Sequence, residues 1–386
     1  MKMDKEPIRI ETDFPGGNAD VIGRFGNDVL LRPDLRRTMR EWFYWHFRVR
    51  FSAPGVYTFR FAAANVMSRA GGAFRPQGEK EWRWLPESDF DTEQRMFRFT
   101  WREGDPDTVY FCVCIPYMPD DLESFLSEHP EVKKTTLCRT PKGREVPLLQ
   151  LDSGGKRTLL LTSRHHACES PGTFVLEGIL RYALSSADFR AAYRILAAPF
   201  MDMDGILDGE QGKYRYPLDQ GSDYGDVQYY EETKALKTLI FREKPDVILD
   251  LHAPYLVGES DENFFIPSVY LSGTPGAERE RLFGTLVEKH TGASHGFRAD
   301  QIIPRGAGCN REDPAYGASG VPNAVIPRLG IGKFGTSLPF TSLSCVFENS
   351  YALSDLGAKK LSVDSWHSFG AGLGKALLEM QTLLHP

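Results

Sequence analysis

The hydrophobic pattern of this chain changes near residue 116, and that change limits the folds open to it. In EWFYWHFRVRF (41–51) the large apolar residues fall on every second position, and later segments such as VYTFRFA and TVYFCVC repeat the pattern. A period of two is typical of strands with one buried face. Gly and Pro pairs such as Pro54-Gly55 separate these segments. We therefore expect residues 1–116 to form an N-terminal antiparallel β-sandwich domain.

From residue 117 onward, apolar runs alternate with amphipathic helical stretches. This alternation predicts an α/β domain with a mostly parallel sheet covered by helices, over residues 117–386. A chain of 386 residues also exceeds the usual size of one core. The expected central strands are RTLLLTS, YRILAAPF, DVILDL and LSCVF. Helices are expected over 119–127, 172–184, 231–242, 276–290 and 363–384, the last open to interruption at its three glycines (370, 372 and 374).

Composition excludes several classes of function. The chain has 46 Lys+Arg and 52 Asp+Glu, a formal net charge of −6, and no long run of one sign. We therefore expect no nucleic-acid partner and no acidic-membrane partner. The charged first residues and the lack of a long apolar stretch predict a cytoplasmic protein without a signal peptide or membrane span. The sequence specifies no oligomeric state.

Residues able to bind a metal follow three of the expected strands. TLLLTSRHHACE leads to His166 and Glu169, DVILDLH ends at His252, and LSCVFE ends at Glu348. Ligands of open α/β sheets bind beyond the carboxyl ends of the strands, so these side chains are expected to converge. Two imidazoles and a carboxylate are the donor set of hydrolytic zinc sites, and a nearby glutamate can act as a base. Taken alone, each histidine could instead be a hydrogen-bonded loop residue, and each glutamate could be part of a salt bridge.

Longer motifs resemble a known family. SRHHACESPGTFVLEG resembles the first zinc motif of the zinc metallocarboxypeptidases, DLHAPY resembles their DLH motif, and SCVFENSY resembles their catalytic-glutamate strand. FPGGNADV, EWFYWHFRV and YFCVCIPYMPDDLESFL resemble the β-sandwich of the cytosolic carboxypeptidase-like subfamily. The resemblance runs from about residue 10 to about residue 355. It implies a carboxypeptidase-like α/β/α sandwich with a mixed sheet after the β-sandwich.

The resemblance also implies roles for single residues. His166, Glu169 and His252 would hold Zn²⁺, and Glu348 would be the general base. In GKYRYPL, Arg215 aligns with an arginine that polarises the scissile carbonyl and stabilises the oxyanion.

Neighbouring residues receive supporting roles. Asp250 would orient the metal site from behind the ligands. His165 stands one position too early for the motif and is expected to be a solvated or packing neighbour. Tyr316 and Tyr351 are the candidates for the tyrosine that assists catalysis in many relatives.

One motif departs from the family pattern. Relatives follow the arginine segment with GxDLNR, whose Asn and Arg bind the terminal carboxylate of the substrate, whereas this chain has GSDYGD (221–226). Asp223 matches, but Gly225 and Asp226 occupy the Asn and Arg positions, and an aspartate repels a carboxylate. We therefore expect a substrate without a plain α-carboxylate next to the scissile bond, or another cation, for example Arg311, in the pocket.

These observations predict a zinc-dependent hydrolase of the metallocarboxypeptidase type that cleaves a peptide or amide bond, with altered recognition of the terminal carboxylate. One alternative is a zinc amidase or N-acyl hydrolase on the same scaffold, and another is a non-catalytic carboxypeptidase-like protein that binds peptides. A nucleotide-binding enzyme is suggested only by GIGKFG (330–335). A loop and a strand, in place of a helix, are expected to follow that segment, which argues against this class.

Overall fold

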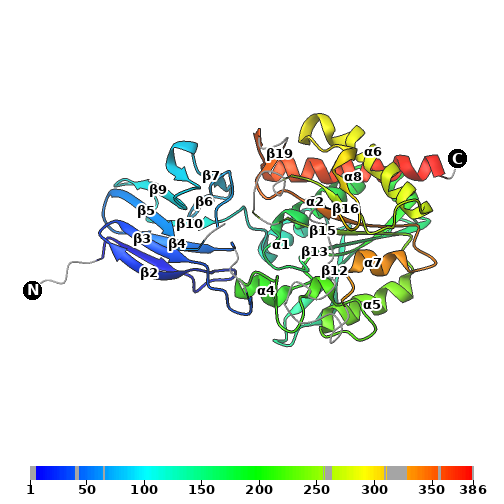
Figure 1. Ribbon diagram of the computed structural model, residues 1–386, viewed down its shortest axis with the longest axis horizontal. Helices are drawn as coiled ribbons and strands as arrows, with labels where there is room; N and C mark the ends of the chain where they lie inside the picture. The colour runs from blue at the N-terminus through cyan, green and yellow to red at the C-terminus, as the bar shows by residue number, and fades with distance from the viewer. Residues whose placement is uncertain are drawn as a thin grey trace, which may run out of the picture.

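The computed structural model describes residues 6–39, 43–63, 66–254, 256, 263–307, 310, 328–354 and 358–384. Figure 1 shows two layered parts joined side by side, with the N-terminus and the C-terminus at opposite ends. The strands of the first part end at Cys112, and helix α1 (Pro119–Glu128) begins the second part. Residue 116, where we expect the division, lies between these two elements, and the domain boundary stays a prediction.

Two five-stranded sheets pack face to face in the N-terminal part, in the orders β1-β4-β10-β6-β7 and β2-β3-β5-β9-β8. All their pairings are antiparallel except β3–β5, which is parallel. Trp45, Phe47 and Val49 are fully buried between the sheets, as the alternation in 41–51 predicts. The strands are β1 (Ile8–Glu11), β2 (Asp20–Phe25), β3 (Asp28–Arg32), β4 (His46–Phe51), β5 (Gly55–Phe61), β6 (Ala73–Pro76), β7 (Arg83–Trp84), β8 (Phe90–Asp91), β9 (Met96–Trp101) and β10 (Thr108–Cys112).

A six-stranded mixed sheet forms the centre of the second part, in the order β11-β12-β14-β13-β15-β18. The four apolar runs expected as central strands are its parallel members, and an antiparallel hairpin, β11–β12, completes one edge. This mixed sheet confirms the predicted α/β class of the second part. The strands are β11 (Lys133–Arg139), β12 (Glu145–Leu151), β13 (Arg157–Ser163), β14 (Tyr193–Ala198), β15 (Val247–His252) and β18 (Leu343–Glu348).

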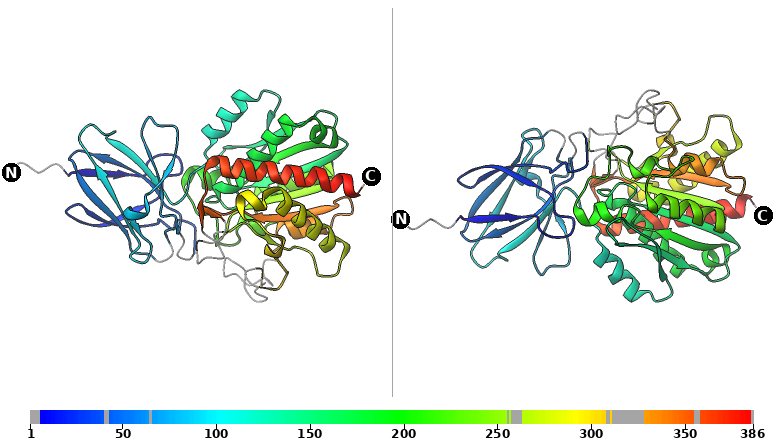
Figure 2. Two further views of the ribbon diagram at one scale, coloured as in Figure 1. Left: turned by 90° about the horizontal axis from the view of Figure 1, so that it is seen from above. Right: turned by 90° about the horizontal axis from the view of Figure 1, so that it is seen from below.

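Helices cover both faces of this sheet (Figure 2). Leu159 and Leu161 of β13 pack in one cluster with residues of α2, α6 and α8, whereas Leu160 packs in another with residues of α5 and α7. The alternation follows from the two-residue period of a strand. The helices are α2 (Ser170–Ser185), α3 (Ala187–Ala192), α4 (Met203–Asp208), α5 (Glu231–Glu243), α6 (Pro275–His295), α7 (Ile331–Thr336) and α8 (Val363–Leu384).

Short elements fill the connections of both parts. The small strands β16 (Ile266–Pro267) and β17 (Ile302–Ile303) pair in parallel, and β19 (Leu353–Ser354) and β20 (Lys359–Lys360) pair antiparallel. Single 3-10 turns cover Glu87–Asp89 in the N-terminal part and Gln220–Ser222 and Ala299–Gln301 in the second part. None of the helices in the described ranges is both long enough and apolar enough to cross a membrane.

Helix α8 runs unbroken despite its three glycines. A Cβ atom on Gly370 would lie 2.2 Å from the Val175 carbonyl oxygen of α2, and one on Gly178 of α2 would lie 2.3 Å from the His367 carbonyl oxygen. The glycines therefore allow the backbones of α2 and α8 to touch. Packing between the two helices offsets the low helix propensity that the sequence suggests.

The β-sandwich also holds a loop of the second part. The Gly16 amide donates to the Leu207 carbonyl at 3.0 Å, and the Asn18 side-chain amide donates to the Gly209 carbonyl at 2.7 Å. The Tyr44 amide donates to the Gln211 side-chain oxygen at 2.8 Å. The N-terminal part thus fixes the segment that leads to residues 213–215.

We expect Gly370→Ala to lower the stability of the protein by roughly 1–3 kcal/mol, because the added methyl group forces α8 away from α2. In an open helix the same substitution would stabilise by about 1 kcal/mol. A lower midpoint of urea denaturation would measure the effect. Ser368→Ala, on the exposed side of the same helix, is the control and should change stability by less than ~0.5 kcal/mol. A Gly370→Ala variant as stable as wild type would contradict this packing.

Candidate metal centre

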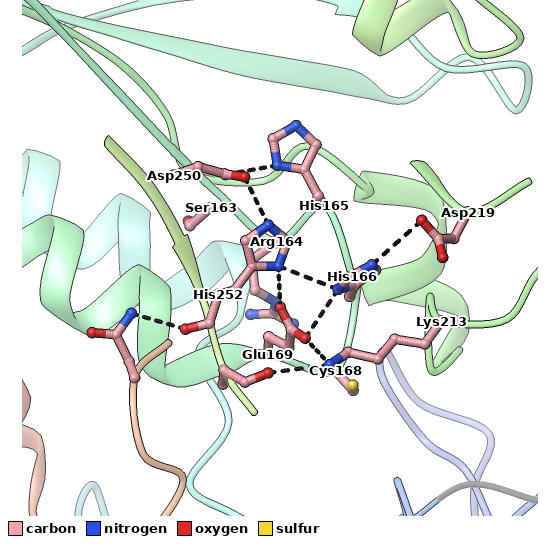
Figure 3. A network of polar contacts seen from close by, with 12 residues as sticks. Ser163, Arg164, His165, His166, Cys168, Glu169, Lys213, Asp219, Asp250 and His252 are labelled. Atoms are coloured by element: carbon pink, nitrogen blue, oxygen red, sulfur yellow. Dashed lines mark hydrogen bonds and ion pairs between the residues drawn. The ribbon is translucent and has the colours of Figure 1, made fainter. Parts of the chain in front are cut away.

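The three predicted ligands meet at the carboxyl ends of β13 and β15 (Figure 3). The Nδ1 atom of His166 lies 3.0 Å from Oε1 of Glu169, and the Nδ1 atom of His252 lies 2.8 Å from Oε2 of the same carboxylate. The two Nδ1 atoms are 3.2 Å apart. Three donor atoms within 4.8 Å of one another can surround one metal ion.

The loop between β13 and α2 is shaped by Arg164. Its backbone has a φ of 62°, which is uncommon for a residue other than glycine. The buried guanidinium donates to the Ala167 carbonyl at 2.7 Å and to the Tyr117 carbonyl at 2.9 Å. These bonds hold the loop in a turn that directs His166 and Glu169 to the same point.

Carboxylates face the outer nitrogens of both histidines. The Nε2 atom of His252 lies 2.7 Å from Oδ2 of Asp250, and the Nε2 atom of His166 lies 3.6 Å from Oδ1 of Asp219. A carboxylate only accepts hydrogen bonds, so it favours the tautomer with the proton on Nε2 and the lone pair on Nδ1. Two such lone pairs and Glu169 repel one another unless a cation or added protons lie between them. The donor set therefore fits a divalent metal.

The charges of the cluster shift its titration strongly. Burial lowers the pKa of His252, but Asp250 and Glu169 outweigh burial and raise it well above its ordinary value. Burial raises the pKa of Glu169, but Lys213 and the two histidines bring it well below its ordinary value. These shifts favour protonated imidazoles beside an ionised Glu169 when no metal is bound. A metal ion must displace such protons, so its apparent affinity should rise with pH.

A second group, His165, Asp250 and His252, also brings three donor atoms together. All three residues are buried. Nδ1 of His165 lies 2.9 Å from Asp250 and Nε2 lies 2.6 Å from the Tyr224 hydroxyl, so both ring nitrogens already have partners. His165 is therefore a buried hydrogen-bonded neighbour of the cluster, and the expectation that it could be solvated is wrong.

Glu348 lies opposite His252 in the register between β18 and β15. Its Oε2 atom is buried and makes no hydrogen bond within the described residues. Burial raises the pKa of this carboxyl group, while His252 and Lys213 partly oppose that effect. A carboxylate whose Oε2 atom is buried and makes no described hydrogen bond beside the cluster can accept a proton.

Arg215 is fully buried in a separate group of charges. Its Nη2 atom lies 2.6 Å from Oδ2 of Asp202 and 2.7 Å from Oε2 of Glu210. The guanidinium charge is thus balanced by two carboxylates, and contact with the three ligands is not among its described interactions. The carbonyl-polarising role of Arg215 remains a prediction.

Two further residues at the cluster were not expected from the sequence. Lys213 lies 2.5 Å from Oε1 of Glu169 and donates to the Ala253 carbonyl at 3.2 Å. Asp219 contacts His166, as described above. Lys213 stands two positions before Arg215 in GKYRYPL. It could have been predicted as a site residue if every cation of this segment, and not only the arginine of the motif, had been considered.

The residues expected in the substrate pocket lie in different places. The Asp223 carboxylate accepts hydrogen bonds from the amides of Tyr229 and Tyr230 and from the Thr233 hydroxyl, at the start of α5. These contacts give no support to a substrate role. Asp226 is exposed. Arg311 and Tyr316 lie outside the described residues.

The curated proteins described below, to which the chain is similar, are named cytosolic carboxypeptidases. No family model matches the chain. The chain is 27% identical over 245 residues to cytosolic carboxypeptidase 6 of Caenorhabditis elegans, covering 54% of this chain and 51% of the relative. It is 28% identical over 261 residues to cytosolic carboxypeptidase 2 of Danio rerio, covering 55% and 35%. The matched region therefore spans about half of the first relative and about a third of the second.

Comparison with solved structures covers nearly the whole chain. A metallo-carboxypeptidase from Pseudomonas aeruginosa, in complex with (2-guanidinoethylmercapto)succinic acid, has a TM-score of 0.77 at 16% identity, over 98% of this chain and 100% of that one. A metallo-carboxypeptidase from Burkholderia cenocepacia has a TM-score of 0.75 at 16% identity, with the same coverage. These likenesses establish the fold. With the curated relatives, they confirm the resemblance to cytosolic carboxypeptidase-like metallocarboxypeptidases.

We expect Asp250→Asn to weaken zinc binding by roughly 10–100-fold, because an amide no longer supplies the negative charge that favours the Nδ1 lone pair of His252. Competition with a chromophoric chelator would measure the dissociation constant. Asp246→Asn is the matched control, since Asp246 precedes the same strand and accepts from the Thr158 amide at 2.8 Å. It should leave zinc affinity unchanged. Wild-type affinity in Asp250→Asn would contradict the assigned role.

Proposed function

We propose that this relative of the cytosolic carboxypeptidases is a zinc-dependent hydrolase that cleaves a peptide or amide bond. The observation that carries the proposal is the meeting of His166, Glu169 and His252 at one point, with Glu348 across the strand pair. The sequence relatives and the fold support a hydrolase of the metallocarboxypeptidase type. The identity of the metal, the substrate and the cytoplasmic location are parts of the proposal.

The donor set favours zinc, because two imidazoles and one carboxylate leave a position open for water or substrate. When bound, zinc would lower the pKa of a water molecule and polarise a carbonyl group. Glu348 would accept a proton from the attacking water and pass it to the leaving amine. Because burial raises its pKa, Glu348 is a stronger base than an exposed carboxylate.

The substrate end is proposed to differ from that of a strict carboxypeptidase. Gly225 and Asp226 replace the Asn and Arg that grip a terminal carboxylate in the family motif, and Asp226 is exposed with its negative charge. An amidated or otherwise neutral end would avoid this repulsion. A zinc amidase or N-acyl hydrolase would use the same metal site.

Turnover should be tested with acetyl-alanyl-Xaa dipeptides, in which Xaa is Ala, Phe, Lys or Glu, each with a free and an amidated carboxyl end. We expect zinc-dependent hydrolysis, with amidated substrates cleaved within about tenfold of the free ones, because Gly225 and Asp226 give a free carboxylate no favourable contact. A tenfold ratio corresponds to about 1.4 kcal/mol. Glu348→Gln should lower kcat by ~10²–10⁴-fold while zinc content stays at the wild-type level, because it removes only the base.

The control for this experiment is Glu145→Gln, an exposed glutamate at the start of β12, which should retain wild-type kcat. No hydrolysis of any dipeptide by the zinc-loaded protein, or full activity in Glu348→Gln, would contradict the proposed hydrolase. A strong preference for free carboxyl ends would leave the hydrolase intact and remove the altered recognition.

A further inference from the structure

A lysine side chain lies inside the metal centre. The ammonium group of Lys213 is 2.5 Å from Oε1 of the ligand Glu169 and donates to the Ala253 carbonyl at 3.2 Å. Its side chain is 14% exposed. Figure 3 shows this side chain reaching across to Glu169 from the side opposite Asp250. A positive charge is thus placed directly beside the ligands.

The backbone fixes Lys213 in this position. Gly212 has a φ of 85°, and a Cβ atom there would lie 2.2 Å from the Ala167 amide nitrogen of the ligand loop. The Cys168 amide donates to the Gln211 carbonyl at 3.1 Å. Tyr214, on the other side, has a φ of 51°. The two loops therefore touch through their backbones, and this contact holds the lysine against the loop that carries Glu169.

Charge at this point comes from the lysine itself. The ordinary pKa of a lysine is about 10.4, so its ammonium group is positively charged at neutral pH. The short contact between the ammonium group of Lys213 and Oε1 of Glu169 places that charge beside the proposed ligand. Arg215, by contrast, lies against Asp202 and Glu210, and its Nη2 atom is only 2.4 Å from the point where a Cβ atom on Gly205 would stand.

We propose that Lys213 is a catalytic residue that stabilises the oxyanion on the scissile carbonyl oxygen, in the role that the family motif gives to Arg215. This inference rests on the proposed hydrolase. Water adds to the carbonyl carbon while Glu348 takes one of its protons, and the π electron pair moves to the carbonyl oxygen. The C=O bond then re-forms, the C–N bond breaks, and the proton passes from Glu348 to the leaving nitrogen. A fixed ammonium favours the charged oxygen over the neutral carbonyl.

A purely structural role would have different consequences. As a counter-ion of Glu169, Lys213 would affect zinc affinity and stability, but it would not distinguish a tetrahedral, negatively charged ligand from a planar substrate. If the role is catalytic, loss of Lys213 should lower mainly kcat and the affinity for tetrahedral analogues, because both depend on interactions made in the transition state.

The test uses the zinc-loaded full chain with Lys213→Met and Lys213→Arg. The probes are the dipeptide panel above and phosphinic pseudodipeptides with the same four side chains, whose P–O⁻ group imitates the oxyanion. For Lys213→Met we expect kcat to fall by ~10²–10³-fold and the phosphinic dissociation constant to rise by about 10²-fold or more. We expect KM to stay within about threefold and zinc to remain at one per chain, since KM then reports only ground-state binding. Lys213→Arg should recover part of both losses.

The matched control is Lys360→Met in β20, where a partly buried lysine donates to the Leu85 carbonyl at 3.1 Å. It should behave as wild type. Wild-type kcat and phosphinic affinity in Lys213→Met would overturn the inference while leaving the hydrolase intact.

Other outcomes are also decisive. If Lys213→Met loses zinc, Lys213→Arg decides, because restored zinc without restored phosphinic affinity assigns the lysine to a counter-ion and overturns the inference. A zinc-loaded wild-type chain that neither cleaves the dipeptides nor binds the phosphinic probes would overturn the hydrolase itself, and the inference with it, before any lysine variant is made.

Discussion

The rest of this molecule depends on one constraint, which is the buried negative charge at the carboxyl ends of the parallel strands. The carboxylates of Glu169, Asp219 and Asp250 are almost fully buried around two imidazoles, and the folded chain must compensate them because isolated buried charges are costly. The ammonium of Lys213 provides part of that compensation. Either added protons on the histidines or a divalent metal between the Nδ1 atoms would provide the rest, so the parallel strands that create the problem also define the site.

The β-sandwich supports this site, although none of its described residues belongs to the cluster of donor atoms. The segment between β1 and β2 and the segment before β4 hydrogen-bond to the loop that contains Gly209 and Gln211. The Gln211 carbonyl in turn accepts from the Cys168 amide of the ligand loop. The core cluster of the sandwich also includes Cys168 and Tyr351 from the second part. The N-terminal part is therefore a scaffold for the cation beside Glu169. Substitutions where the β-sandwich contacts this loop are expected to alter the candidate metal centre without touching it.

Much of the candidate site could be predicted from the sequence, because the proposed metal ligands and Glu348 stand at or soon after the ends of apolar strands, and the order of those strands brings the ends together. Residues outside such motifs were harder to place. Lys213 and Asp219 reach the cluster through the positive φ values at 212 and 214 and the turn at 220–222, and no periodic pattern encodes those turns. The three glycines of α8 predicted a disturbed helix, because the sequence does not show that another helix packs against them and keeps α8 continuous.

X-ray absorption spectroscopy at the zinc edge tests the central claim most directly. In the zinc-loaded wild-type chain, one zinc per chain should have two imidazole ligands and a carboxylate at ~2.0–2.2 Å. This signal should persist in His165→Gln and lose one imidazole in His166→Gln. A chain that takes up no stoichiometric zinc, or a spectrum that responds to His165 but not to His166, would contradict the account.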